Sequence, residues 1–491
     1  MNANLKLAAE GAEVDAWLVL MTSDGWIGVE GLDEAVGARV RALAGRRAMG
    51  GEAGSWAIDD ASSPAVVVVG VGVAEEVDVR GLHRAAGVGV EALTRCRAGR
   101  VGVAAGRSAV GAIAGDRVAE ALGEGMELAG WRYHAYRSAG EASTVTELTA
   151  PSAAGRDGLA SGIAWGGSGN YARQLAAAPP NLATPLYLAE KAEALADATG
   201  LSCRVFQGAE LEEREMFGLV NVGKGSDQPP CLIELVHEPA GLSADAPTIA
   251  LVGKSITFDA GGLSLKIEDT MRYMKYDMSG GAAVMGAMHA AARLGLPLRV
   301  VGLLPAAENV VGRGGFRVDD ILAYPNGVSV EITNTDFEGR LVLADALIHA
   351  NREHRASDIV DLGTLTGEVV TVLGHDTAGL WSNDAGLVSA LGEAGEAAGE
   401  PVWPMPLNAE HRRLIRDSFH ADMVNRNLEG PGKSCQCAAF LEPFAVGEGR
   451  PRWSHLDIAG PVHVVEGDPP YAPGPTGFGA RLLGRWLVAL G

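Results

Sequence analysis

The sequence contains few cysteines for its length, and they are widely spaced. Only five occur among 491 residues, and the count is odd. A small disulfide-stapled fold would need paired cysteines in a short chain, so we expect reduced thiols in a cytoplasmic setting. Cys435 and Cys437 form a C-x-C pair, but no second pair lies nearby, which disfavours a zinc ribbon.

Long apolar runs are also missing. No segment approaches the roughly 18 continuous apolar residues needed to span a bilayer. The apolar stretch from Ala16 to Met21 is too short for the core of a signal peptide and predicts a buried strand instead. We therefore expect a soluble, cytoplasmic protein with no membrane partner.

Positive charge is scarce, because 40 basic side chains stand against 61 acidic ones and the formal net charge is -21. The negative electrostatic field of such a chain repels phosphate backbones, which disfavours nucleic acid as a partner.

Histidine metal motifs are missing too. No H-E-x-x-H pattern occurs, and His349 and His354 are five residues apart, which disfavours a histidine-based zinc peptidase.

The length of the chain predicts two domains, since one hydrophobic core rarely serves so many residues. We expect an α/β protein with a smaller N-terminal α/β domain over residues 1–165. A larger catalytic domain over residues 166–491 would have a central mixed, mostly parallel sheet flanked by helices. The weak periodicity between Gly140 and Gly169 suggests a connection between the two domains.

Alternating strand and helix patterns support this fold class. The β-branched run from Ala65 to Gly70 predicts a buried parallel strand in the N-terminal part. In the C-terminal half, we predict two helices, Gly280–Leu294 and Val342–Asn351. The strands predicted there are Thr248–Gly253, Arg299–Leu304, Val328–Ile332, Asp358–Leu362 and Trp453–Asp457.

Charged side chains follow several of these strands, at the sheet edge where open α/β proteins bind ligands. They are four carboxylates, two lysines and an arginine: Asp259, Asp277, Asp336, Glu338, Lys254, Lys266 and Arg340. Four ionised carboxylates repel one another unless cations separate them, and oxygen-rich sites of this kind suit Mg, Mn or Zn. Taken singly, Asp277 could instead cap a helix, Lys254 could lie on the surface, and Arg340 could form a salt bridge.

Three sequence blocks resemble the leucyl (cytosol) aminopeptidase family. They are NTDFEGRL at residues 334–341, VGKSITFDAGGLSLK at residues 252–266, and MKYDM at residues 274–278. The resemblance extends over residues 168–491 and is weak over the N-terminal domain, for which it implies an assembly or regulatory role. It implies an aminopeptidase that acts on peptides with a free N-terminus and assembles as a homohexamer.

The resemblance also implies roles for individual residues. Two divalent metal ions, Mn2+ or Zn2+, would activate a water molecule. Lys266 would stabilise the oxyanion, and Arg340 would hold a bicarbonate ion that acts as general base. The implied metal ligands are Lys254, Asp259, Asp277, Asp336 and Glu338. The implied substrate-binding residues, which favour apolar Leu- or Met-like N-terminal residues, are Met274, Asn334, Thr364, Leu365, Gly367, Ala459 and Val462.

One departure from the family pattern lies inside the ligand block. Phe337 replaces the usual alanine between Asp336 and Glu338, which would place a large ring beside the metal centre. Two alternatives therefore stay open. The chain could be a specialised dipeptidase or other amide hydrolase, or a non-catalytic scaffold or regulatory member of the family.

Overall fold

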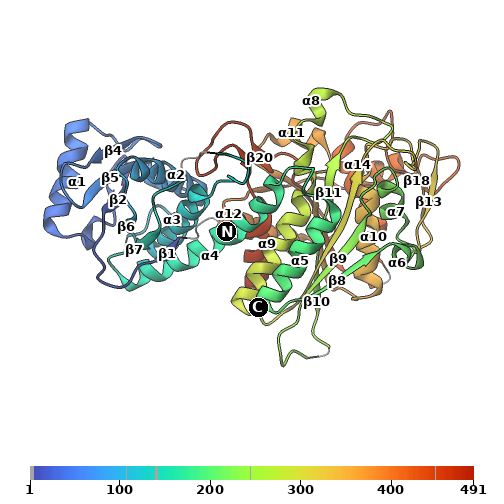
Figure 1. Cartoon of the computed structure of the whole chain (residues 1–491), viewed down its shortest axis with the longest axis horizontal. Helices are drawn as coiled ribbons and strands as arrows, with labels where there is room; N and C mark the ends of the chain where they lie inside the picture. The colour runs from blue at the N-terminus through green and yellow to red at the C-terminus, as the bar shows by residue number, and fades with distance from the viewer. Residues whose placement is uncertain (1–4, 107, 139–141, 244, 448) are drawn as a thin grey trace. The chain divides into compact units, whose positions relative to one another are not determined.

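A computed structural model describes residues 5–106, 108–138, 142–243, 245–447 and 449–491 (Figure 1). The chain forms two compact units, the first made of residues 1–170 and 464–474, the second of residues 171–463 and 475–491. The first unit therefore takes in a short segment from near the C-terminus, which the predicted division after residue 165 does not include. Among the described residues, no helix combines the length and apolar character that crossing a bilayer requires.

The first unit is built on a seven-stranded sheet whose central strands are buried on both faces. In β5 (Ala65–Gly72), Val67 and Val69 belong to a hydrophobic cluster with α2 (Val79–Arg95) and α3 (Gly115–Gly130). Val66 and Val68 point to the other face, where they cluster with residues of α1 (Glu34–Arg47). β5 pairs in parallel with β2 (Ala16–Thr22), so both strands predicted in this part are confirmed. The remaining strands are β1 (Lys6–Leu7), β3 (Trp26–Ile27), β4 (Trp56–Asp59), β6 (Arg100–Val103) and β7 (Glu147–Thr149).

The second unit is built on a nine-stranded mixed sheet that is mostly parallel, as predicted. Its central strands pair in parallel, whereas β8 and β9 pair in antiparallel fashion at one edge and β16 is antiparallel to β19 near the other. The strand order is β17 (Val402–Pro404), β16 (Ala378–Ser382), β19 (Arg452–Asp457), β15 (Asp358–Gly363), β10 (Thr248–Gly253), β12 (Arg299–Asn309), β9 (Cys231–His237) and β8 (Ser202–Gln207), with β11 (Ser255–Asp259) paired to β12.

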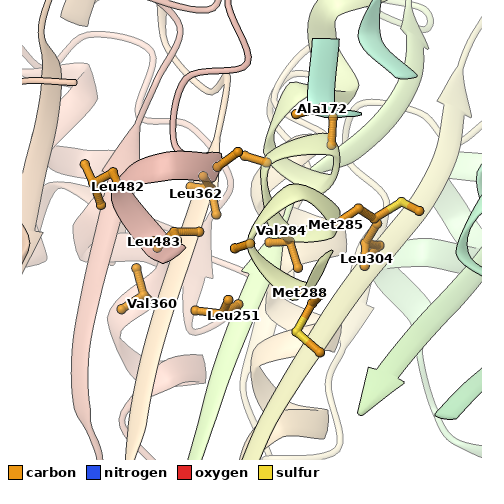
Figure 2. Packing of buried hydrophobic residues seen from close by; sticks show 14 of the residues in the cluster. Ala172, Leu251, Val284, Met285, Met288, Leu304, Val360, Leu362, Leu482 and Leu483 are labelled. Atoms are coloured by element: carbon orange, nitrogen blue, oxygen red, sulfur yellow. The ribbon is translucent and has the colours of Figure 1, made fainter. Parts of the chain in front are cut away.

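Helices cover both faces of this sheet, so its strands are apolar on both sides (Figure 1). One face holds α5 (Pro185–Thr199), α9 (Ser279–Leu294), α12 (Ala385–Ala398) and α15 (Ala480–Leu490). The other holds α7 (Phe217–Gly223), α10 (Gly339–Arg352) and α14 (Lys433–Ala445). Figure 2 shows Val284 and Met288 of α9 packed beside Leu251 and Leu304 of the sheet. Gly302 admits this close approach, because a Cβ there would lie 2.9 Å from Met288 Cγ.

Most of the segment 140–169, predicted as a connection between the domains, belongs to the 25-residue helix α4 (Ala153–Ala177), which runs from the first unit into the second. Residues 140 and 141 lie outside the described part of the chain. The glycines of α4 allow close packing against a neighbouring helix and do not indicate a loop. Gly158, Gly162 and Gly166 recur every four residues on one helix face. A Cβ on Gly162 would lie 2.0 Å from the Glu120 carbonyl oxygen of α3, so only glycine permits this approach.

The strand predicted at Val328–Ile332 is present as β14 (Ser329–Glu331), but it does not belong to the central sheet. It pairs with β13 (Ile321–Ala323) and β18 (Met423–Val424) in a separate three-stranded sheet. The block that follows it, residues 334–341, therefore enters the site from this small sheet and the start of α10. The helices predicted at Gly280–Leu294 and Val342–Asn351 correspond to α9 and α10.

Candidate active site

Four carboxylates and two lysines of the second unit meet beside the ends of β10 and β11. Lys254 connects these two strands, and Asp259 is the last residue of β11. Asp277 lies in the 3-10 helix η3 (Met274–Met278), immediately before α9. Glu338 occupies the N-cap position of α10. The sequence-predicted ligands therefore reach one place from four different parts of the fold.

Lys254 lies between two carboxylates in the interior. Its Nζ is 2.8 Å from Asp277 Oδ2 and 2.9 Å from Glu338 Oε1, and it donates a hydrogen bond to the Thr364 carbonyl oxygen at 2.9 Å. Gly339 leaves room for this amine, because a Cβ there would lie 2.6 Å from Nζ. Burial alone would lower the pKa of Lys254, but Asp277 and Glu338 raise it above its usual value.

Lys266 makes a second bridge between carboxylates. Its Nζ is 2.9 Å from Asp259 Oδ2 and 2.6 Å from Asp336 Oδ1. The loop before it turns through Gly261 and Gly262, both at positive φ, where side chains are disfavoured. Burial alone would lower the pKa of Lys266, but Asp259 is the largest of the charges that raise it above its usual value. Lys266 therefore carries a positive charge at neutral pH.

The carboxylates outnumber the lysines that face them, and their electrostatics reflect this excess. Burial and then Glu338 raise the pKa of Asp259 to about 7. Burial and then Asp259 raise the pKa of Asp336 to about 7, and burial raises that of Asp277 to about 6 despite Lys254. Each shift marks a carboxylate that lacks sufficient positive charge nearby, and a bound cation would supply that charge.

The donor atoms fit divalent metal. Asp259, Asp336 and Glu338 each offer an oxygen, and the three oxygens lie within 4.8 Å of one another. Asp277 Oδ2 and Asp336 Oδ1 are buried, and each is paired with a lysine amine, at 2.8 and 2.6 Å. Oxygen donors with one amine nitrogen suit Mn2+ or Zn2+.

Asn309 is a supporting residue that the sequence analysis missed. Its Nδ2 lies 2.9 Å from Asp259 Oδ1, 3.0 Å from the Thr335 carbonyl oxygen and 3.3 Å from Glu338 Oε2. It is the last residue of β12 and is fully buried. The sequence analysis looked for polar residues that follow predicted strands. It did not include Asn309, because the predicted strand ended at Leu304, five residues before the observed end of β12.

Asp457 is a second residue that was missed, at the end of β19. Its Oδ1 accepts the backbone N–H groups of Leu365 and Ala459, each at 3.2 Å, and its Oδ2 accepts the Thr366 hydroxyl at 2.6 Å. One buried carboxylate thus holds two of the predicted substrate-binding positions together. Thr364 joins them to the ligands, because its hydroxyl donates to Asp277 Oδ1 at 2.6 Å.

The other predicted substrate-binding residues lie in different surroundings. Asn334 supports a ligand, because its Oδ1 accepts the Asp336 backbone N–H at 2.7 Å. Met274 is partly buried in η3, and Gly367 is exposed at the start of α11 (Gly367–Leu373). Val462 is 4% exposed and belongs to the hydrophobic cluster on the α9 face, so only a small part of it faces solvent.

Phe337 lies against arginines. Its ring centroid is 4.8 Å from the guanidinium carbon of Arg340 and 4.7 Å from that of Arg426. Arg340 is buried, and its Nη1 donates to the Asn425 carbonyl oxygen at 2.7 Å. Asn425 in turn donates to the Asn334 carbonyl oxygen at 2.6 Å. Arg340 is therefore tied by a short chain of contacts to the loop that carries Asp336.

The sheet thus carries, at its strand ends, a cluster of buried carboxylates and lysines whose donor atoms fit divalent metal ions. Residues 170–484 match the catalytic domain of the Cytosol aminopeptidase family, and residues 27–140 match its N-terminal domain. The chain belongs to this family of metallo-aminopeptidases, so the resemblance inferred from the sequence is confirmed.

Individual relatives are similar over most of their length. The probable cytosol aminopeptidase of Geobacter sulfurreducens is 40% identical, over 86% of this chain and 85% of the relative. That of Geotalea uraniireducens is 39% identical, over 94% of this chain and 93% of the relative. Among solved structures, the bottromycin maturation enzyme BotP in complex with Mn has a TM-score of 0.86. BotP is 36% identical to this chain, over 97% of this chain and 99% of its own.

Proposed function

We propose that this metallo-aminopeptidase hydrolyses the N-terminal peptide bond of peptides with two divalent ions, Mn2+ or Zn2+, in its active site. The observation that carries the proposal is the convergence of Lys254, Asp259, Asp277, Asp336 and Glu338 on one partly buried centre. Manganese is supported by the similar BotP structure, which is described in complex with Mn.

Five side chains would hold the two ions. Asp259 and Glu338 lie at the middle of the cluster, both near Asn309, and would contribute to holding both ions. Lys254 and Asp277 would help to hold one ion, and Asp336, with its side chain and backbone carbonyl, the other. Binding through the Lys254 amine requires that its ammonium release a proton to solvent, which two adjacent dications favour. When bound, the ions would polarise the scissile carbonyl and lower the pKa of a water molecule toward neutrality.

Two further cationic side chains, Lys266 and Arg340, would act on the substrate and on the general base. Lys266 keeps its charge and would stabilise the oxyanion that develops on the scissile carbonyl. Arg340 would hold a bicarbonate ion as general base. Its guanidinium is held by Asn425 and flanked by Phe337, which fixes its orientation before any anion arrives.

Substrate selection would come from an apolar pocket for the N-terminal side chain. Leu365 and Ala459, both held by Asp457, would line it together with Met274, Thr364, Gly367 and Val462, and Asn334 would keep the ligand loop in place. Such a pocket favours Leu- or Met-like residues, although apolar pockets discriminate only modestly. We further propose a cytoplasmic homohexamer.

The test is hydrolysis of leucine p-nitroanilide by protein stripped with a chelator and then supplied with Mn2+ or Zn2+. We expect activity to return in the wild type and not in Asp336→Ala, whereas Asp227→Ala, at an exposed position, retains it. N-acetyl-leucine p-nitroanilide should not be cleaved, because the reaction requires a free amine. Activity without metal, or equal cleavage of the blocked substrate, would contradict the proposal.

A further inference from the structure

A second group of metal-binding side chains lies at the other end of α10. Glu234, His349 and His354 each offer one ligand atom, and the three atoms lie within 4.8 Å of one another. Glu234 Oε2 is 2.8 Å from His349 Nε2 and 2.7 Å from His354 Nε2. His349 is buried, while Glu234 and His354 keep 13% and 19% of their side chains exposed, so an ion from solvent has access.

The fold brings these residues together from distant parts of the sequence. In β9, Leu232 and Val236 belong to the cluster on the α10 face, so Glu234 between them points to the same face. His349 lies in the last turn of α10, and His354 follows just after the helix ends. Glu338 and His349 are eleven residues apart on this helix, which places them about 16 Å apart along its axis. The group is therefore distinct from the active site.

From this convergence we infer that Glu234, His349 and His354 bind one zinc ion. Two imidazole nitrogens and one carboxylate oxygen are the protein donors of a three-ligand zinc site, in which water takes the fourth position. The Glu234 oxygen now lies at hydrogen-bond distance from each imidazole nitrogen. Around a tetrahedral ion with bonds of 2.0–2.1 Å these oxygen–nitrogen distances would grow to about 3.3 Å, which small side-chain rotations provide.

Zinc binding requires that each imidazole Nε2 give up any proton that it carries. A neutral imidazole that now donates from Nε2 would transfer its proton to Nδ1 and bind zinc through the freed Nε2 lone pair. An imidazolium would instead release one proton to solvent. The carboxylate needs no change, because it already presents an oxygen to both rings.

The surroundings provide space and restrict movement. A cavity of about 170 Å3 lies against His349, with Asp345 and Glu353 also in its wall, so this side of His349 is not filled by other side chains. Phe206 packs at 68° to the His349 ring, with centroids 5.3 Å apart, which limits rotation of that ring.

The test compares zinc content and thermal stability in the full-length wild type, His354→Gln and Glu234→Gln after dialysis against zinc chloride. His354→Gln keeps an N–H donor for Glu234, and so preserves the hydrogen bond of the metal-free fold, but glutamine is a poor zinc ligand. His420→Gln, at an exposed histidine, is the matched control. Active-site ligands are the same in all four proteins, so failure of the proposed catalytic function would not affect the comparison.

We expect the wild type and His420→Gln to bind one more zinc ion per chain than either cluster variant. Zinc should also raise their melting temperature further, because the ion would join β9 to the end of α10. Equal zinc content in the wild type and a folded His354→Gln or Glu234→Gln would overturn the inference. The three side chains would then form only a hydrogen-bonded contact between the sheet and the helix.

Discussion

The two ends of α10 carry clusters of opposite chemistry. At the N-terminal end, Glu338 joins other carboxylates around two lysines, and at the C-terminal end His349 and His354 converge on one glutamate. The helix dipole favours negative groups near the start of a helix, which suits the carboxylate of Glu338 there. The comparison teaches that one helix can present carboxylate oxygens to one cluster at its start and imidazole nitrogens to another at its end.

The largest expected effect is that of Glu338→Gln, which removes a charge that faces Lys254 and Asn309. The variant should lose metal from the active site and at least ~10²-fold in kcat, since removing even a group that only supports a ligand costs 10–100-fold. Metal analysis and leucine p-nitroanilide kinetics measure both. In contrast, His354→Gln should change kcat by less than about twofold. A large loss in His354→Gln would show that the two ends of α10 are not independent.

Lys266→Ala should have the next largest effect. Loss of the ammonium should lower kcat by about 10²–10³-fold, as for removal of one oxyanion donor, while the metal content stays unchanged. Lys224→Ala, at an exposed lysine, should retain full kcat. If Lys266→Ala lost its metal together with its activity, the role of Lys266 would instead be to hold the carboxylates in place.

The sequence predicted which charged side chains converge better than it predicted the residues that support them. Lys254, Asp259 and Asp277 lie in motif blocks, and each block lies next to an end of a strand or helix. Asn309 was missed because Pro305 and the alanines after it lack the β-branched pattern of a strand, although β12 continues through them. The contact of Glu234 with His349 depends on tertiary packing across 115 residues, which no local spacing encodes.

The helix that the sequence predicts least well is rich in glycine. The segment that contains Gly158 and Gly162 has little periodicity, and glycine is a poor helix former, so the sequence predicts a connection between domains there and no helix. Its glycines instead lie against α3, where a Cβ would meet backbone atoms. Tertiary packing outweighs helix propensity here, and only the partner helix shows why the glycines are there.

Asn309→Ala tests the supporting contacts at the oxygen-rich end. We expect a 10–100-fold loss in metal affinity, because Asp259 and Glu338 would lose the amide that orients both. Added Mn2+ should restore most of the activity, unlike in Glu338→Gln. Asn326→Ala, whose amide donates to a surface carbonyl of Pro443, is the control and should bind metal like the wild type. Wild-type affinity in Asn309→Ala would contradict a supporting role.

Substitution of Phe337 should have the smallest effect on activity. Phe337→Ala restores the family's usual residue and removes the ring that contacts Arg340 and Arg426. The free energy of unfolding should fall by about 1–2 kcal/mol, with kcat changed by only a few fold. Phe337→Leu keeps apolar bulk without the ring face, so chemical denaturation of both variants separates packing from the cation–π contacts. Equal stability of Phe337→Leu and the wild type would show that the arginine contacts contribute little.

The most direct test of the two-metal centre is a crystal structure of the protein grown with Mn2+, with diffraction data collected at the manganese absorption edge. We predict two anomalous peaks in each chain, both adjacent to Asp259 and Glu338, with Lys254 Nζ bound to one of them. A single peak, or none, with Lys254 still paired to Asp277 and Glu338, would contradict the two-metal account.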